Sequence, residues 1–284
     1  MKTTTLNNGV EIPMLGFGVY QIRDPKQCKE IVIEAIKAGY RLIDTAASYG
    51  NEEAVGEAIK ECGVPREELF ITTKLFAPQN AGYEKTKIAF EKSLKRLGLD
   101  YIDLYLIHLP YGDYYGSWRA MTELYESGKI RAIGVSNFYP DRLLDLVLNN
   151  KVAPAVNQVE CHPLYQKEYA RVHMEELGVK CEAWSPLAQA KRGVFENPIL
   201  MEIAKNHNKT VAQVMLRWNI QRGIIVIPKT VHKDRLLENL DVWDFEITKE
   251  EMEKIATLDT GKSELIDHYD LEQIKAIRAR KFDD

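Results

Sequence analysis

Four residues with complementary acid–base chemistry each lie at the end of a short apolar run or just beyond one. They are Asp44, Tyr49, Lys74 and His108. The aspartate, the lysine and the histidine end the runs 40–44, 69–74 and 102–108, and the tyrosine lies in the loop after the first run. Helix-like segments separate these runs, which predicts parallel strands whose carboxyl ends share one face. The four side chains are therefore expected to meet.

Together the four groups can protonate a carbonyl oxygen. Tyr49 would give the proton, and Lys74 would lower the pKa of this phenol from its ordinary value of about 10. Asp44 would hold the ammonium, and His108 would position the oxygen. Taken singly, an aspartate, a tyrosine and a histidine at such places are more often a turn former, a surface aromatic and a core residue. Their shared position at predicted strand ends favours the catalytic interpretation.

The alternation of apolar runs and helical segments predicts an α/β protein, a (β/α)8 barrel. The predicted strands are 40–44, 69–74, 102–108, 131–136, 155–160, 180–185, 223–228 and, on a weaker pattern, 241–244. Helices are predicted between them, at 25–38, 52–62, 83–97, 117–127, 140–148, 167–177 and 210–222. Runs that are apolar at every position fit parallel strands buried on both faces. A doubly wound nucleotide-binding sheet is disfavoured, because Gly16 and Gly18 are followed by Gln21 where a third glycine is needed.

Additional segments are expected around the barrel. Residues 3–15 read as a hairpin that turns at Asn7-Asn8-Gly9. Further helices are expected at 198–208, 248–258 and 271–281. Since no linker or break in composition is evident, residues 1–284 are expected to form one domain.

The bulk composition excludes several classes of protein. A net charge of −4 and a pI near 6.0 argue against a nucleic-acid partner. Neither a signal peptide nor an apolar stretch long enough to span a membrane is evident, so a cytoplasmic protein is expected. Cys161-His162 lacks a second ligand pair at a suitable spacing, so no metal site is expected.

Several motifs together resemble the aldo-keto reductases. The first is Leu42-Ile43-Asp44-Thr45-Ala46, followed by Tyr49 and Gly50-Asn51-Glu52. The others are Thr73-Lys74-Leu75, Leu106-Ile107-His108, Gly134-Val135-Ser136-Asn137-Phe138, Asn157-Gln158-Val159-Glu160 and Ile227-Pro228-Lys229-Thr230. The similarity is greatest to the bacterial subgroup of 2,5-diketo-D-gluconate reductase, glyoxal reductase and prostaglandin F synthase. It implies a TIM barrel, NADPH/NADP+ as cofactor, a small-molecule carbonyl substrate and a monomer.

The resemblance also implies which residues hold the cofactor. Ser136, Asn137 and Gln158 would bind the nicotinamide carboxamide, and Trp184 would stack under the ring. The pyrophosphate would lie on the loop containing Ser185, Leu187 and Gln189, where Ala188 and Ala190 replace glycines common in relatives. The segment that binds the adenosine phosphate would contain Lys229, Thr230, Val231, Arg235, Glu238 and Asn239. Within it, Lys229, Thr230 and Arg235 would reach the phosphate, and Asn239 would contact the adenine.

Two departures concern the substrate pocket. Leu109 stands where relatives commonly have tryptophan, and the loop 111–116 is short. Both predict a missing pocket wall, which would favour long aldehydes over glyoxal-sized dicarbonyls. The basic residues Arg278, Arg280 and Lys281 read equally well as an anion-attracting tail and as solvated charge.

Two other functions remain open from the sequence. One is a non-catalytic NADPH-binding module, which would keep the phosphate-binding residues. The other is a Schiff-base barrel aldolase with Lys74 as nucleophile, which would leave Tyr49 and the phosphate-binding residues without a task.

Overall fold

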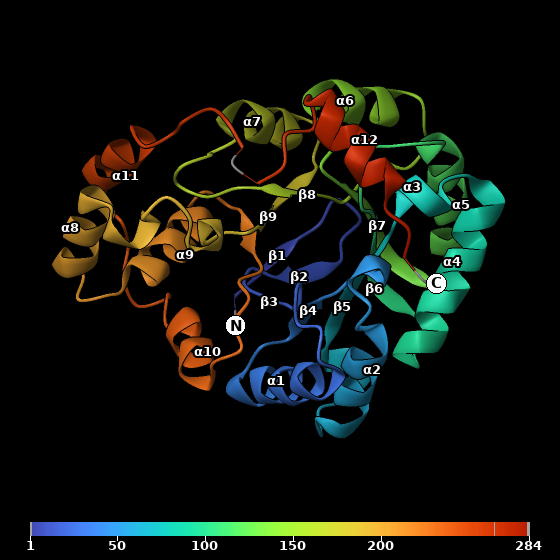
Figure 1. Ribbon diagram of the computed structural model, residues 1–284, viewed down its shortest axis with the longest axis horizontal. Helices are drawn as coiled ribbons and strands as arrows, with labels where there is room; N and C mark the ends of the chain where they lie inside the picture. Colours follow the sequence, from blue (N-terminus) through green and yellow to red (C-terminus); the bar gives the residue numbers. More distant parts are fainter. Residues whose placement is uncertain (1, 264, 283–284) are drawn as a thin grey trace.

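The computed structural model describes residues 2–263 and 265–282, and within them eight parallel strands form a barrel surrounded by helices (Figure 1). In spatial order the strands are β3 (Phe17–Gly18), β4 (Leu42–Asp44), β5 (Phe70–Leu75), β6 (Ile102–Ile107), β7 (Ile130–Ser136), β8 (Val156–Glu160), β9 (Lys180–Trp184) and β10 (Ile225–Val226). The two edges meet where Leu15 bridges to Val226 and the Gly16 amide donates to the Val226 carbonyl at 2.8 Å. This closure confirms the predicted (β/α)8 barrel.

One of the eight predicted strands is wrong. Residues 241–244 form no strand, although the apolar pattern of Val242 and Trp243 suggested one. The missing strand is β3, which has two residues and was not predicted. Seven predicted strands match β4 to β10 with small shifts at their ends.

The closing strand depends on two glycines. A Cβ atom on Gly16 would lie 2.5 Å from Leu42 Cγ, and one on Gly18 would lie 3.1 Å from the Ile227 carbonyl oxygen. The first distance is impossible and the second is tight, so small residues are required where this segment crosses its neighbours. The same glycines made β3 hard to recognise as a strand, since glycine disfavours strands.

Each barrel strand is followed by a helix on the outside. These helices are α1 (Pro25–Ala38), α2 (Glu52–Glu61), α4 (Tyr83–Leu97), α5 (Tyr114–Glu126), α6 (Pro140–Leu148), α7 (Glu168–Glu176), α9 (Val211–Gln221) and α10 (Lys233–Leu240). Local sequence sets their ends. The Asp24 side chain accepts from the Gln27 amide at the start of α1, and Gly39 ends the helix at a φ of 115°. Thr210 and Gln213 form a capping box at the start of α9.

Shorter elements decorate the barrel. They are the helices α3 (Ala77–Asn80), α8 (Pro198–Asn206), α11 (Lys249–Ala256) and α12 (Leu271–Ala279), and the 3-10 turns η1 (Ala47–Tyr49), η2 (Arg66–Glu68), η3 (Ala188–Ala190) and η4 (Val194–Glu196). The helices α8, α11 and α12 were predicted, and α3 was not. Among the described helices, none is both long and apolar enough to cross a membrane.

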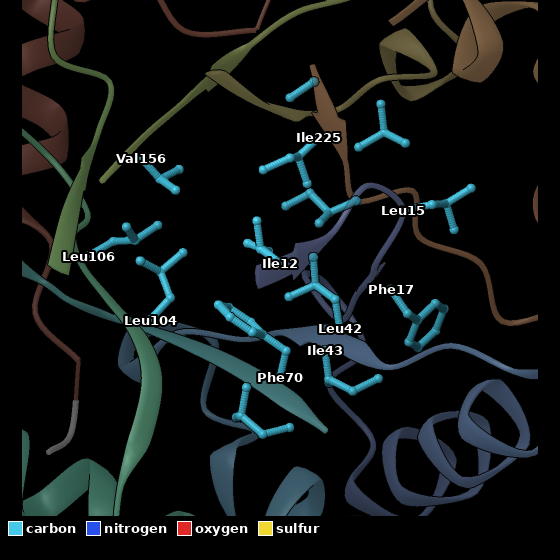
Figure 2. Packing of buried hydrophobic residues seen from close by; sticks show 14 of the residues in the cluster. Ile12, Leu15, Phe17, Leu42, Ile43, Phe70, Leu104, Leu106, Val156 and Ile225 are labelled. Carbon is cyan, nitrogen blue, oxygen red and sulfur yellow. The ribbon is translucent and has the colours of Figure 1, made fainter. Parts of the chain in front are cut away.

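The predicted N-terminal hairpin is present and lies at the amino ends of the strands. It consists of β1 (Thr3–Thr5) and β2 (Glu11–Pro13), which pair antiparallel. The side chains of Asn7 and Asn8 donate to the carbonyls of Pro154 and Arg131, which lie near the starts of β8 and β7. Ile12 is completely buried, and Figure 2 shows it among Leu42, Leu104 and Ile225 from three barrel strands. The hairpin therefore packs against the end of the barrel opposite to the predicted site.

Candidate active site

The ammonium of Lys74 joins the predicted acid–base residues. Lys74 is completely buried, and its Nζ lies 2.6 Å from Asp44 Oδ1. It also donates to the Thr45 carbonyl at 2.8 Å and to Tyr49 Oη at 3.4 Å. The carboxylate at the end of β4 and the phenol of η1 are thus held by one amine from β5.

The contacts of Asp44 place this cluster inside the barrel. Gln158 Nε2 donates to Asp44 Oδ2 at 2.8 Å. The two residues come from β4 and β8, and β5, β6 and β7 lie between those strands in the sheet. Their side chains can meet only across the barrel interior. Since Asp44 ends its strand, the cluster lies at the carboxyl ends, where barrel enzymes carry their active sites.

Tyr49 stays protonated at neutral pH. Burial raises its pKa well above the ordinary value of about 10, and the charges of Asp44, Tyr20 and Glu182 raise it further. The prediction of a lowered pKa is therefore wrong. Burial of the phenol outweighs the effect of the Lys74 ammonium, which is nearer to Asp44, at 2.6 Å, than to Tyr49 Oη, at 3.4 Å.

His108 faces the same phenol as an uncharged ring. Its centroid lies 5.6 Å from that of Tyr49, in an edge-on arrangement, and its Nδ1 lies 3.3 Å from Ser48 Oγ. Burial lowers its pKa well below 6.5, and the positive charges of Lys74 and His268 act in the same direction. A neutral imidazole carries one N–H, which can donate to a carbonyl oxygen.

The residues predicted to hold the nicotinamide form a connected set beside the cluster. Trp184 Nε1 donates to Asn137 Oδ1 at 2.9 Å, and Asn137 Nδ2 donates to Ser136 Oγ at 3.0 Å. Ser136 Oγ in turn donates to the Gln158 carbonyl at 2.8 Å. The indole ring is therefore fixed next to a patch of amide and hydroxyl groups, which suits a flat ring bearing a carboxamide.

The loop predicted to hold the pyrophosphate has an unusual backbone. Ser185, Ala188, Gln189 and Ala190 all have positive φ, between 49° and 57°. The alanines thus adopt the conformation that glycine takes most easily, so the loop keeps its shape at a cost in strain. Gln189 Nε2 donates to Ser185 Oγ at 3.1 Å, and Leu187 is half-buried.

The predicted adenosine phosphate residues lie around the start of α10. Thr230 Oγ1 accepts from the His232 amide at 3.0 Å, and Asn239 is buried. Lys229 and Arg235 are exposed, and neither forms an ion pair with the described residues. Two unpaired cations near a helix N-terminus form a donor set that fits a phosphate group. Val231 is half-buried, and Glu238 accepts from Thr210 Oγ1 at 2.6 Å, so its carboxylate already has a partner.

A buried carboxyl group that the sequence reasoning missed lies beside Gln158. Glu182, on β9, has no exposed surface, and its Oε2 accepts from Gln158 Nε2 at 3.0 Å. A signal was available in the sequence, since a glutamate inside an otherwise apolar strand is rare unless it has a task.

The pocket wall that was predicted to be missing is present. Leu109 is only 6% exposed and packs with Phe76, Tyr111 and Ile277, the last from α12. Tyr114, Tyr115 and Gly116 are the first turn of α5, so half of the supposed short loop is helix. The C-terminal segment therefore covers Leu109, and Figure 1 shows α12 at the rim of the barrel, between α6 and α3.

The cavity at the other end of the barrel carries no comparable chemistry, and no metal-binding cluster is found among the described residues. A cavity of about 280 Å³ lies at the opposite end of the barrel, but the arginines in its lining, Arg171 and Arg222, both pair with Glu168. Among the residues that the structure describes, no three or more His, Cys, Asp or Glu side chains are grouped to hold a metal ion.

Comparison with known proteins agrees with this geometry. The model of the Aldo/keto reductase family matches residues 14–260. Glyoxal reductase of Bacillus subtilis is 51% identical over 257 residues, which cover 90% of this chain and 92% of the relative. Methylglyoxal reductase DkgA of Escherichia coli is 44% identical over 260 residues, 90% of this chain and 93% of the relative. An aldo-keto reductase of Bombyx mori solved in complex with NADP is 37% identical, with a TM-score of 0.89 over 95% of this chain and 96% of that one.

Proposed function

The chain belongs to the aldo/keto reductase family, and we propose that it reduces aldehydes and ketones to alcohols with NADPH as the cofactor. The observation that carries the proposal is the position of Lys74, whose ammonium contacts both Asp44 and Tyr49 inside the barrel. A protonated phenol beside a fixed cation is the acid that carbonyl reduction requires.

Each residue of the cluster has a separate role in the proposed reaction. Tyr49 gives its proton to the carbonyl oxygen, and Lys74 stabilises the phenolate that remains. Asp44 fixes Lys74, while the neutral His108 donates its N–H to the substrate oxygen. When bound, a nicotinamide cofactor would supply the hydride for the carbonyl carbon. Ser136, Asn137 and Gln158 would orient its carboxamide, and Trp184 would lie under its ring.

The remaining cofactor residues are assigned to the phosphates. The loop with Ser185, Leu187 and Gln189 would receive the pyrophosphate through its backbone. Lys229, Thr230 and Arg235 would meet the adenosine phosphate, which supports NADPH over NADH. Val231, Glu238 and Asn239 would contact the adenosine itself.

The substrates we propose are small aldehydes and dicarbonyls. Two relatives are named for glyoxal and methylglyoxal, and the pocket wall at Leu109 is closed by the C-terminal segment. A closed apolar wall gives small carbonyls more contact than an open one.

The test is a panel of glyoxal, methylglyoxal, longer aldehydes, ketones and keto-sugars, with loss of NADPH absorbance as the measurement. We expect turnover of several aldehydes, and its loss in Tyr49→Phe. Tight NADPH binding without turnover of any carbonyl would instead identify a non-catalytic module. A Schiff-base aldolase is disfavoured, because Lys74 is buried and its amine already has three oxygen partners.

A further inference from the structure

A fifth ionisable side chain is connected to the acid–base cluster. Glu182 lies opposite Gln158 in the pairing of β8 with β9. The amide nitrogen of Gln158 donates to Asp44 Oδ2 at 2.8 Å and to Glu182 Oε2 at 3.0 Å. Because Asp44 Oδ1 accepts from Lys74, an uninterrupted chain of hydrogen bonds runs from Lys74 through Asp44 and Gln158 to Glu182.

Glu182 is an unusual group to find in such a place. It has no exposed surface, and its Oε1 has no hydrogen-bond partner among the described residues. No cation of the described residues forms an ion pair with it, since the ammonium of Lys74 contacts Asp44. Buried carboxyl groups are normally paired, so the ionised form of Glu182 is costly in this place and the neutral form is favoured.

The charge of Glu182 depends on pH within the working range of an enzyme. Burial raises its pKa to about 8, the charge of Asp44 acts in the same direction, and the Gln158 hydrogen bond and Lys74 oppose them. The charged or titratable groups that face it are Asp44 from β4, Lys74 from β5 and Tyr49 from η1. Its neighbours on the adjacent strands, Gln158 and Ile225, are uncharged.

The charge of Glu182 acts on Tyr49, the proposed proton donor. Burial is the main cause of the raised pKa of Tyr49, and negative charge on Asp44 and on Glu182 adds to it. An ionised Glu182 therefore makes the phenol harder to deprotonate, and a neutral one makes it easier.

On the basis of the proposed carbonyl reduction, we propose that Glu182 is a positioning residue of the site: it fixes the Gln158 amide together with Asp44, and in its ionised form its negative charge keeps the proton on Tyr49. The chemical step itself is unchanged, with hydride passing to the carbonyl carbon and the Tyr49 proton to the oxygen. The consequence concerns the rate of alcohol oxidation at high pH, where Glu182 is ionised. Alcohol oxidation needs Tyr49 as a base, and an ionised Glu182 opposes the formation of this base.

The test is Glu182→Gln, which removes the charge and keeps the shape and an acceptor for Gln158. Alcohol oxidation with NADP⁺ is measured at about pH 6 and about pH 9.5, on either side of the carboxyl titration. At the higher pH the variant should oxidise alcohols roughly three- to ten-fold faster than the wild type, because a pKa shift of one unit changes the phenolate fraction about ten-fold. At the lower pH, where Glu182 is already neutral, the two rates should agree.

A matched control separates the charge from a general effect on the fold. Glu160→Gln is the same change at a buried glutamate on the neighbouring strand β8, whose carboxylate contacts His162 and Ser263. The rate of alcohol oxidation by Glu160→Gln, relative to that of the wild type, should be the same at both pH values. A second variant, Glu182→Met, also removes the hydrogen bond to Gln158, and should raise KM for NADPH several-fold in addition.

The outcomes distinguish this inference from the proposed function. A wild type that reduces no carbonyl overturns both. In another case the wild type is active, while the oxidation rate of Glu182→Gln, divided by that of the wild type, is the same at both pH values. This result overturns only the role of Glu182. A readout independent of activity is carbon-13 NMR of carboxyl-labelled glutamate, in which the signal lost in Glu182→Gln should titrate near pH 8. A signal that titrates in the ordinary range of glutamate would also overturn the inference.

Discussion

At the scale of single residues, the order of contacts around Lys74 decides the acid–base chemistry. Asp44 and the Thr45 carbonyl are nearer to its ammonium than Tyr49 is. Most of the positive charge is therefore already compensated, and the phenol keeps its proton. A protonated Tyr49 is an acid ready for the reductive direction.

Replacement of Tyr49 by phenylalanine should remove this acid and leave the barrel intact. The rate of aldehyde reduction is expected to fall by roughly 10²–10⁴-fold, the contribution of a positioned general acid. NADPH affinity, measured by fluorescence titration, should stay close to that of the wild type. Tyr20→Phe is the control, because the Tyr20 ring lies 4.9 Å from that of Tyr49 but no hydrogen bond to Lys74 depends on it. A Tyr49→Phe variant with half the wild-type rate would exclude this residue as the donor.

Replacement of Arg235 by alanine should weaken NADPH but not NADH. The exposed guanidinium has no ion-pair partner among the described residues, so it is free for a 2′-phosphate. The loss is expected to be about 1.5–3 kcal/mol, the scale of a hydrogen bond to a charged group. Lys233→Ala is the control, since that ammonium pairs with Glu34 at 3.1 Å. Equal losses for both cofactors in calorimetric titrations would show that Arg235 acts elsewhere.

At the scale of elements, the loop after β9 keeps a backbone shape that its side chains disfavour. Ala188 and Ala190 have φ values of 51° and 57°, and such a conformation costs a non-glycine residue roughly 1–2 kcal/mol. Strain of this kind persists where the surrounding structure holds it, often at binding loops. The loop is thus shaped before any ligand arrives.

Ala190→Gly should relieve this strain. We expect the free energy of unfolding to rise by up to about 1 kcal/mol, since the strain relieved exceeds the extra flexibility of glycine in the unfolded chain. Ala276→Gly, at an exposed position inside the helix α12, should instead lose about 1 kcal/mol. Denaturant unfolding measures both. A loss of stability in both variants would mean that the loop is not strained at Ala190.

Leu109→Trp tests whether α12 closes the pocket wall. Because Leu109 is packed against Ile277 and Phe76, the larger ring should overpack this contact and destabilise the protein by about 1–3 kcal/mol. Ile277→Ala in the same chain should recover part of that loss, which a double-mutant cycle would measure as coupling. Additive effects would show that the two side chains do not share the space.

At the scale of the whole molecule, the C-terminal segment is fastened across the mouth of the barrel by a few buried contacts. Tyr111 Oη lies 2.7 Å from His268 Nδ1, and the ring of Phe282 packs edge-on against Phe76 at 4.7 Å. Burial lowers the pKa of His268 to about 4, and the positive charges of Lys167 and Arg142 act in the same direction, while Asp267 opposes them. This fastening therefore requires a neutral histidine.

Acid should loosen the segment. Between pH 6.5 and about 4 the unfolded chain protonates His268 and the folded chain does not. Stability is therefore complete above this window and falls as the pH drops through it, by up to about 3 kcal/mol. His268→Gln should reduce this dependence, whereas His173→Gln on the outer helix α7 should not. Hydrogen exchange of α12 at pH 7 and pH 4.5 measures the effect, and equal protection at both values would contradict it.

Much of the fold and of the cluster could be predicted, because the decisive signals are local. Apolar runs, glycine stops and polar residues at strand ends are each visible in the sequence, and seven strands and the contacts of Asp44, Tyr49 and Lys74 were found from them. The strand β3 was not predicted because its two residues depend on tertiary pairing with Ile43 and Asp44 rather than on propensity. Residues 241–244 have an apolar pattern typical of a strand, but they pair with none of the described strands.

The electrostatic features of the site could not be predicted from the sequence. The raised pKa of Tyr49 and the link from Glu182 to Asp44 both depend on distances across the barrel interior, between strands that are not adjacent in the sheet. The wall at Leu109 likewise depends on α12, which lies 160 residues and more further along the chain. Sequence patterns identify which charged and polar side chains are present. Only the packed structure shows which of these side chains neutralise one another.

The hairpin β1–β2 has a practical consequence for anyone who wishes to immobilise this protein. It packs against the amino ends of the strands, so a support attached at Thr3–Thr5 would face away from the catalytic mouth. A support attached next to Phe282 would lie against the mouth, since this ring packs on Phe76, and Phe76 in turn packs on His108. Beads or electrodes coupled at the hairpin should therefore leave substrates a clear path, and coupling at the other end should obstruct them.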